Sequence, residues 1–307
     1  MKVLITGISG TIGRGVARRL VLRDYEVIGI DRRPWPDPPV GVQAFAEDVR
    51  KRPAEEIFRT HRPDVVVHLA TSASVSRSRD ERMRANLNGT KSVVDCSARH
   101  GVKQVVFVGR HTIYGASDTS PLYHREDDPP LGGAMFPELA DLVAADLYAG
   151  SALWRYPEMD TAVLRCVYTL GPSRQGTLSR FLSKSRTPMV LGFDPLFHFM
   201  HEFDVEEAIV AAVEHKIRGV YNVAGPQPLP LSVVAERAGS TPVPMIEPLF
   251  RHVQGRYGFS SLSERATGHL KYPIVLDDSA FRKATGFDHA YDEMQTIDGF
   301  RWTKTRS

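Results

Sequence analysis

The 307-residue chain contains only two cysteines, Cys96 and Cys166. Each lies in an otherwise apolar or helical stretch, which excludes a disulfide framework and a cluster of thiolate metal ligands. Sparse, unpaired cysteines are typical of proteins that work in a reducing compartment. We therefore expect a cytoplasmic protein that holds no metal ion.

Long hydrophobic runs are missing as well. No segment reaches the roughly 18 consecutive apolar residues that a membrane-spanning helix requires. The apolar run at the start stops at Thr6 and Gly7, too early for a signal peptide. Neither sign of charge dominates, since 39 Lys and Arg balance 36 Asp and Glu. Membranes and nucleic acids are therefore not expected as partners, and small molecules are.

Short β-branched runs alternate with amphipathic helical stretches through the first half of the chain. Crossovers of this length return the chain in the parallel direction, which predicts an α/β fold with a doubly wound parallel sheet and helices on both faces. The expected strands are 3–5, 26–30, 64–70, 104–108 and 161–167, and the expected helices are 11–22, 53–60, 80–99 and 136–153.

A glycine-rich segment lies between the first expected strand and the first expected helix. The spacing Gly7-x-x-Gly10-x-x-Gly13 provides a tight turn and a close backbone approach to a pyrophosphate, while the helix start adds unpaired amides and a positive dipole end. This position predicts dinucleotide binding. The expected contacts come from Gly7, Ser9, Gly10, Thr11, Ile12 and Gly13.

An acidic residue, Asp31, ends the second expected strand. Its carboxylate is expected to accept hydrogen bonds from the two adenine-ribose hydroxyls, which favours NAD over NADP. Arg32 and Arg33 keep NADP open, because a guanidinium can hold the 2'-phosphate; solvated loop charges are the alternative. Asp48, next to Val49, is a candidate contact for the adenine amino group, with a surface acid as the alternative.

Together with other segments, these motifs resemble the extended short-chain dehydrogenase/reductase superfamily, in its NAD-dependent epimerase and dehydratase branch that acts on sugar nucleotides. The resemblance spans most of the chain and is specific to the superfamily rather than to one substrate. It is carried by Thr6-Gly7-x-x-Gly10-x-x-Gly13, Asp31, Asp48-Val49, His68-Leu69-Ala70, Asn86-Leu87-Asn88-Gly89-Thr90, Ile113-Tyr114-Gly115, Leu164-Arg165, Gly171-Pro172 and Phe199-Met200-His201-Glu202-Phe203-Asp204-Val205.

The resemblance implies further site residues. Leu69 and Ala70 end a strand that lines the cofactor in the family, and Asn86 matches an asparagine that steadies the neighbouring strand. All three become cofactor-side candidates, with a buried strand end and a polar helix face as alternatives. Arg165 is a candidate for a substrate phosphate, with a buried ion pair as the alternative. Family members bind nucleotide-linked substrates and pair through helices beside the strand at 104–108, which implies a homodimer.

The regular alternation loosens after Gly171-Pro172. We expect residues 1–172 to form an NAD(P)-binding Rossmann domain and 173–307 a smaller mixed α/β lobe that binds the substrate. Part of 196–225 is expected to return to the main domain, and 219–223 is a candidate strand of the main sheet.

The catalytic half departs from the family pattern. The family has Ser or Thr four residues before the Tyr of its x-Tyr-Gly turn, where this chain has Arg110, and no tyrosine here is followed by lysine four residues later. Two registers for the family's Tyr-x-x-x-Lys place Phe136 and Ala140, or Glu138 and Leu142, at those positions.

Several residues are candidates to replace the missing pair. Arg110 could hold an anionic substrate or stabilise an oxyanion, with a structural ion pair as the alternative. His111 has a side chain whose ordinary pKa is near neutral, Tyr114 follows two residues beyond Thr112, and Glu138 lies in the segment that faces the expected cleft; a packed or surface role is the alternative for each. Two functions stay open: an NAD(P)-dependent oxidoreductase or isomerase with a non-standard catalytic site, and a redox-inactive dinucleotide-binding protein acting as sensor or assembly partner.

Overall fold

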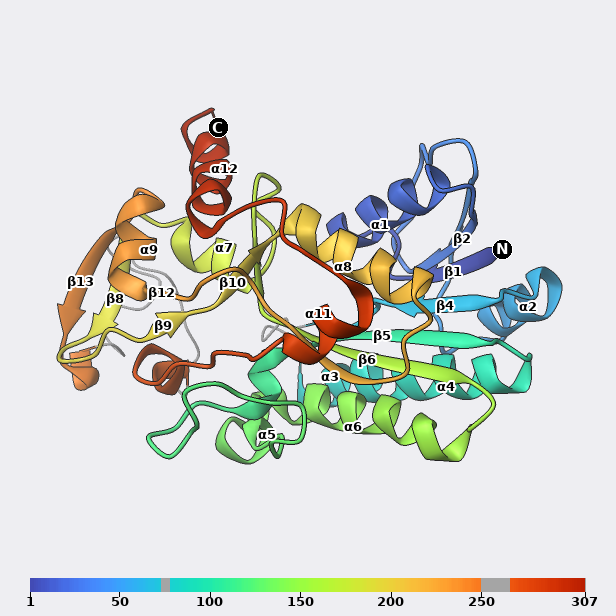
Figure 1. Cartoon of the computed structure of the whole chain (residues 1–307), viewed down its shortest axis with the longest axis horizontal. Coiled ribbons are helices and arrows are strands. Elements are labelled where there is room, and N and C mark those ends of the chain that lie inside the picture. The colour runs from blue at the N-terminus through green and yellow to red at the C-terminus, as the bar shows by residue number, and fades with distance from the viewer. Residues whose placement is uncertain (73–77, 250–265, 307) are drawn as a thin grey trace.

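The computed structural model describes residues 1–72, 78–249 and 266–306, and its main feature is a seven-stranded parallel sheet (Figure 1). The strand order is β11-β6-β5-β4-β1-β2-β3, which confirms the predicted doubly wound sheet. The order reverses between β1 and β4, the place where ligands bind in sheets of this kind. The strands are β1 (Lys2–Thr6), β2 (Glu26–Asp31), β3 (Val42–Ala46), β4 (Val65–His68), β5 (Gln104–Arg110), β6 (Asp160–Cys166) and β11 (Gly219–Val223).

Helices cover both faces of this sheet. α1 (Thr11–Val21) and α8 (Glu202–Glu214) pack on one face, and α2 (Arg52–His61), α4 (Gly89–Arg99) and α6 (Ala140–Arg155) pack on the other. Alternate strand residues enter the two cores: Val3 and Ile5 of β1 join the α1 side, and Leu4 joins the α2 side. Burial on both faces explains why the strands are apolar along their whole length.

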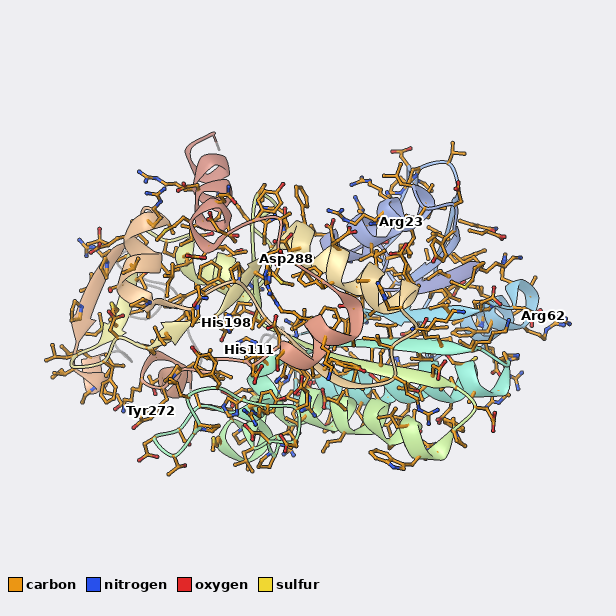
Figure 2. The ribbon with its side chains drawn as sticks, in the orientation of Figure 1. Arg23, Arg62, His111, His198, Tyr272 and Asp288 are labelled. Atoms are coloured by element: carbon orange, nitrogen blue, oxygen red, sulfur yellow. The ribbon has the colours of Figure 1, made fainter. Side chains whose placement is uncertain are left out.

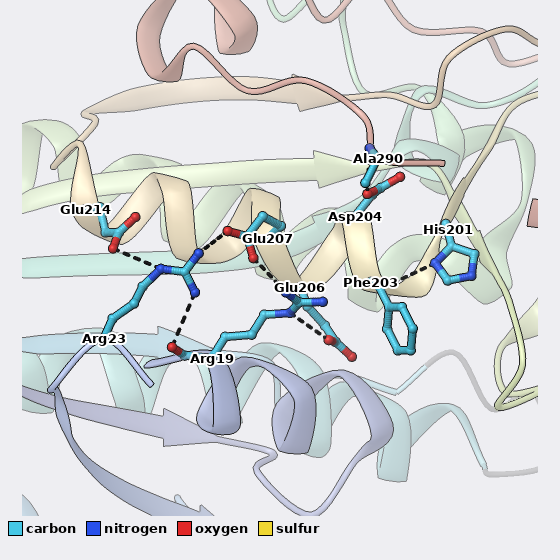
Figure 3. A network of polar contacts seen from close by, with 9 residues as sticks. All are labelled: Arg19, Arg23, His201, Phe203, Asp204, Glu206, Glu207, Glu214 and Ala290. Carbon is cyan, nitrogen blue, oxygen red and sulfur yellow. Dashed lines mark hydrogen bonds and ion pairs between the residues drawn. The ribbon is translucent and has the colours of Figure 1, made fainter. Parts of the chain in front are cut away.

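Ion pairs join α1 to α8 (Figure 3). Nε of Arg19 lies 3.0 Å from Oε2 of Glu206, and Nη1 of Arg19 lies 2.8 Å from Oε2 of Glu207. Arg23 bridges Glu207 and Glu214. These contacts attach a helix from the second half of the chain to the first helix of the chain.

A second group of elements builds a smaller core beyond one end of the sheet (Figure 1). Its strands are β7 (Tyr168–Leu170), β8 (Arg186–Val190), β9 (Leu196–Phe197), β10 (Phe199–His201), β12 (Leu229–Pro230) and β13 (Thr241–Met245), which form three two-stranded sheets. Its helices are α7 (Thr177–Leu182), α9 (Leu231–Arg237) and α12 (Glu293–Arg306). The candidate strand 219–223 is β11 and belongs to the main sheet, whereas the domain boundary at residue 172 stays a prediction.

Two predicted helices differ from the observed ones. The helix expected at 80–99 is divided into α3 (Arg79–Met83), a π-helical segment (Arg84–Asn88) and α4. The helix expected at 136–153 begins as α6 only after a 3-10 turn (Pro137–Leu139), because the residue before a proline is forced into an extended conformation, as at Phe136 with φ −129° and ψ 90°. Short helices also occur at α5 (Gly132–Met135) and α11 (Ser279–Thr285). No described helix combines the length and apolar composition needed to cross a bilayer.

Candidate active site

Two of the three glycines of the first turn, Gly7 and Gly13, are held too tightly for side chains. Gly7 has a positive φ of 78°, and a Cβ there would lie 2.9 Å from the backbone nitrogen of Ala70. A Cβ on Gly13 would lie 2.5 Å from the carbonyl oxygen of Gly7. The amide of Gly10 donates to the same oxygen over 3.1 Å. The turn therefore packs directly against the end of β4 and the start of α1.

The start of α1 has the properties of an anion site. Gly10 is its N-cap and supplies no side-chain capping bond, and the first turn contains no acidic residue. The first amides of a helix have no intrahelical partner, and the helix dipole is positive there. Ser9, Thr11 and Ile12 lie in this segment, so a diphosphate would meet backbone amides rather than side chains.

The carboxylate of Asp31 is fixed beside this turn. It accepts hydrogen bonds from the amides of Ser9 at 3.2 Å and Arg33 at 2.9 Å, and Oγ of Ser9 donates to the Arg33 carbonyl at 2.7 Å. The guanidinium of Arg33 is exposed, with Nε 3.7 Å from Oδ1 of Asp31. Arg32 is also exposed. The structure thus brings together the acid that favours NAD and an arginine that could favour NADP.

Asp48 is engaged by a neighbouring arginine. Nε of Arg50 lies 2.8 Å from Oδ1 of Asp48, and this hydrogen bond, opposed by partial burial, lowers the pKa of Asp48 to about 2. Val49 packs against the core on the α2 face of the sheet. At neutral pH Asp48 is therefore an ionised, partly buried acid rather than a freely solvated one.

Asn86 occupies the π-helical segment and is fully buried. Its Oδ1 accepts from the amide of Ser72 at 2.8 Å, and its Nδ2 donates to the carbonyl of Ser72 at 2.9 Å and to a carboxylate oxygen of Asp141. Leu69 and Ala70 lie just before this contact, with the amide of Leu69 bonded to Thr6. Asn86 therefore fixes the segment after β4 against α6, the role that the resemblance implies.

Arg110 and His111 lie at the carboxyl end of β5. Nδ1 of His111 is 3.2 Å from the carbonyl oxygen of Cys166, and its ring meets that of Tyr168 edge to face at 4.4 Å. Burial lowers the pKa of His111 to about 3, with further contributions from His269 and His198, so the ring is neutral at pH 7. Figure 2 shows His111 and His198 where the sheet meets the smaller core.

Tyr114 and Arg165 belong to a different group of contacts. The hydroxyl of Tyr114 donates to Oδ1 of Asn222 at 2.7 Å and accepts from Nη1 of Arg165 at 2.9 Å. Nη2 of Arg165 lies 2.9 Å from Oδ1 of Asp146, in a buried ion pair. Burial raises the pKa of Tyr114 to about 12. These contacts match the ion-pair alternative that the sequence left open for Arg165.

Glu138 is half-buried in the 3-10 turn before α6 and acts electrostatically on His269. His269 stacks on Phe136 with ring centroids 4.4 Å apart and is near enough to lower the pKa of His111. Nothing in the sequence indicates that His269 is a neighbour of the candidate site, because more than 150 residues separate it in the chain from His111. Arg110, His111 and Glu138 thus lie around one histidine-rich region, whereas Tyr114 lies in the Arg165 group.

Two other features lie apart from these residues. A cavity of about 470 Å³ opens beside the loop after β11 and α11, lined by residues such as Gly225, Asp278 and Arg282. Side chains of Glu55, Cys96 and His100 bring three potential metal ligands within 4.8 Å of one another at the far end of α4. Burial raises the pKa of Cys96 to about 12, so its thiol is protonated at neutral pH. None of the predicted site residues takes part in either feature as described.

The chain is similar to several curated proteins. Uncharacterized protein Rv0501 of Mycobacterium tuberculosis (strain ATCC 25618 / H37Rv) is 26% identical over 264 residues, which cover 82% of this chain and 69% of the relative. Protein CapI of Staphylococcus aureus is 24% identical over 237 residues, covering 71% and 70% of the two chains. Spore coat polysaccharide biosynthesis protein SpsK of Bacillus subtilis (strain 168) is 25% identical over 228 residues, covering 73% of each.

Solved structures share the fold. UDP-glucose 4-epimerase of Thermus thermophilus in complex with NAD superimposes with a TM-score of 0.77 at 22% identity, covering 99% of both chains. MoeE5 in complex with UDP-glucuronic acid and NAD gives a TM-score of 0.79 at 20% identity, covering 100% of both. The model of the NAD dependent epimerase/dehydratase family matches residues 3–224, which include the glycine turn, Asp31 and the main sheet. This chain therefore belongs to the NAD dependent epimerase/dehydratase family.

Proposed function

We propose that this protein binds NAD at the turn from Gly7 to Gly13 and acts as an oxidoreductase or isomerase on a small polar, nucleotide-linked substrate, using a proton-transfer group other than Tyr-x-x-x-Lys. One observation carries the proposal: a Cβ on Gly7 or Gly13 would overlap neighbouring backbone atoms at the turn, which lies at a helix start without a side-chain cap. The fold neighbours crystallised with NAD support the same cofactor.

The fit of NAD to this cradle follows from the donors present. The backbone amides of the turn and of Thr11, Ile12 and Gly13 would hold the diphosphate, and Asp31 would accept the adenine-ribose hydroxyls. Asp48 and Val49 are the proposed adenine side. Leu69 and Ala70 line the cofactor, and Asn86 keeps their segment in place. When bound, NAD supplies reversible hydride acceptance.

Side chains of the protein would then accept and donate the protons of the reaction. Neutral His111 donates through Nδ1 to the Cys166 carbonyl, which leaves Nε2 as an acceptor with no hydrogen-bond partner among the described residues. A substrate hydroxyl could donate to that nitrogen. Glu138 is a second proton-accepting candidate at the half-buried edge of the region. Tyr114, with its hydroxyl bonded on both sides, is better suited to fixing Arg165 than to releasing a proton.

The substrate class is proposed from the fold neighbours. MoeE5 is described with UDP-glucuronic acid, and the T. thermophilus protein is a UDP-glucose 4-epimerase. A sugar nucleotide is therefore the first class to test. NADP is the alternative cofactor, because the exposed guanidinium of Arg33 lies beside Asp31. We also propose a homodimer formed through α4 and α6.

The experiment has two parts. Calorimetric titration with NAD and with NADP measures cofactor binding, and the cofactor-loaded protein is then incubated with a panel of sugar nucleotides while nicotinamide absorbance and product identity are followed. We expect NAD to bind more tightly and at least one sugar nucleotide to be converted. Failure of both cofactors to bind at millimolar concentration would contradict the proposal.

A second function, a redox-inactive NAD-binding protein, is favoured by a specific observation. The chain has no Tyr-x-x-x-Lys, and the pKa of His111, lowered to about 3, makes it a weak base at neutral pH. Positioned general acid–base catalysis is typically worth about 10²- to 10⁴-fold in rate. Tight NAD binding without reduction or turnover across the panel would support this second function over the first.

A further inference from the structure

Arg110 brings a positive charge to the end of β5, and no acid within residues 1–72, 78–249 and 266–306 pairs with it. In the register of the sheet, Arg110 lies opposite Cys166 of β6, at the carboxyl ends of the strands. Nε of Arg110 is inaccessible to solvent and has no hydrogen-bond partner among the described residues. By contrast, the buried arginine of the neighbouring strand, Arg165, has Asp146 at 2.9 Å. The two arginines lie on adjacent strands, but among the described residues only Arg165 has a counter-charge.

Among the residues that the structure describes, none that acts on Arg110 carries a negative charge at neutral pH. The groups that act on it electrostatically are Cys166, Tyr168 and Arg180. Burial raises the pKa of both the Cys166 thiol and the Tyr168 phenol to about 12, so both are neutral, and Arg180 adds a second positive charge. Burial lowers the pKa of Arg110 itself, and proximity to Arg180 lowers it further. Arg110 is partly buried and its Nε is shielded from water, so its charge is partly desolvated, and no described acid compensates it. An anion that binds there would supply the missing counter-charge.

His111 adds a second unpartnered polar atom next to this charge. Its Nε2 is solvent-inaccessible and has no hydrogen-bond partner among the described residues. Because Nδ1 donates to the Cys166 carbonyl, Nε2 carries a lone pair and accepts rather than donates. Tyr168 lies close to both residues. Its ring centroid is 4.4 Å from that of His111, and its phenol interacts electrostatically with Arg110. A ligand that satisfies both atoms carries an anionic group and a hydroxyl.

We propose that Arg110 and His111 form a subsite for an anionic group of the substrate, a carboxylate or a phosphate, that lies close to a hydroxyl. Arg110 donates to the anion and Nε2 of His111 accepts from the hydroxyl. This inference rests on the proposed function only in assigning the ligand to the substrate, because the subsite is built from β5 and not from the glycine turn.

Binding of small probes tests the subsite. D-glucuronate, D-glucose 6-phosphate and neutral D-glucose are titrated against the protein with and without NAD and followed by NMR. We expect at least one anionic sugar to bind at least tenfold more tightly than glucose, and the two anions separate carboxylate from phosphate recognition. Arg110→Met should abolish this difference, whereas Lys184→Met, which removes an exposed cation just beyond α7, should retain it. His111→Phe should weaken the binding of all three sugars.

A melting measurement separates a recognition arginine from a structural one. Removing the uncompensated charge in Arg110→Met should leave the melting temperature of the free protein unchanged or higher, whereas Arg165→Met, which leaves Asp146 unpaired, should lower it. A lower melting temperature for Arg110→Met, or equal affinity for glucose and both anions in the unmodified protein, would overturn the proposal. Loss of NAD binding with anion recognition intact would instead contradict only the proposed function.

Discussion

The guanidinium of Arg165 and the carboxylate of Asp146 form an ion pair at 2.9 Å in which both side chains are almost completely buried, with 6% and 2% exposed. Arg165 is the penultimate residue of β6 and Asp146 lies on α6, so the pair joins the sheet to this helix. The same guanidinium holds the hydroxyl of Tyr114. The pair therefore fixes Tyr114 and the carboxyl end of β6 relative to α6.

Breaking this pair should destabilise the fold. In Asp146→Asn the Arg165 charge remains buried without a counter-charge, and we expect the free energy of unfolding to fall by about 3–5 kcal/mol, measured by urea denaturation. Asp298→Asn is the control, because the Arg237–Asp298 pair lies at the surface, where water screens the charges, and its loss should change the free energy of unfolding little. Similar losses in the two variants would contradict this account.

A methyl group in the glycine turn should remove NAD binding. The Cβ of Gly13→Ala would lie 2.5 Å from the Gly7 carbonyl oxygen, so the turn must shift, and we expect calorimetry to show NAD affinity reduced by at least about tenfold, or 1.4 kcal/mol. Gly150 is also helical but has open space at its Cβ position. Gly150→Ala should bind NAD normally and gain about 0.5–1 kcal/mol of stability. Normal NAD binding by Gly13→Ala would show that the cofactor lies elsewhere.

The acid beside the turn should set the cofactor preference. In Asp31→Ala the ribose hydroxyls lose their acceptor and the 2'-phosphate no longer meets a carboxylate, so we expect NAD to bind about tenfold or more weakly while NADP gains from Arg33. Titrations with both cofactors measure the ratio. Asp37→Ala removes an exposed acid from the proline-rich loop and should leave the ratio unchanged. An unchanged ratio in Asp31→Ala would count against the assigned role.

Buried neutral histidines should make stability depend on pH. Burial lowers the pKa of His68 to about 4, whereas the unfolded side chain has its ordinary value near 6.5. Between these values the unfolded chain binds a proton that the folded chain does not, so stability is lost as the pH falls through this window. The loss from pH 7 to pH 5 is about 2 kcal/mol for one such histidine.

Substitutions measure how much His68 contributes to the loss of stability between pH 7 and pH 5. Denaturation of His68→Gln at both pH values should show a smaller loss between them than the unmodified protein shows, by about the same 2 kcal/mol. His215→Gln, at an exposed position, should retain the full loss. A His68→Gln variant with an unaltered pH dependence would mean that His68 is not neutral in the folded protein.

The outer face of α6 should mediate the proposed homodimer. Leu147 and Trp154 are seven residues apart, on one face of the helix, and are 53% and 79% exposed. A charge in this face should prevent association, so we expect Trp154→Glu to be monomeric in sedimentation equilibrium at concentrations where the unmodified protein is dimeric. Leu22→Glu, at an 83% exposed leucine after α1, should remain dimeric. Dimers of Trp154→Glu would place the interface elsewhere.

The sequence by itself determined the parallel sheet and the place of the glycine turn. Strand and helix periodicities, and the spacing of Gly7, Gly10 and Gly13, are local patterns, and the turn lies between neighbouring elements β1 and α1. Asp31 could be placed for the same reason, because parallel strands bring their carboxyl ends to one edge. The predicted start of the helix at Phe136 was wrong, because the proline that follows keeps Phe136 extended and α6 begins only after Leu139.

The tertiary structure alone decided which candidate side chains have partners. Arg110 and Arg165 lie near the carboxyl ends of neighbouring strands, yet among the described residues only Arg165 faces an acid from α6. Tyr114 meets Asn222 across 108 residues of chain. Burial and charge compensation depend on contacts between distant segments, and neither periodicity nor spacing contains that information, because each side chain's partner is set by how helices and strands pack together.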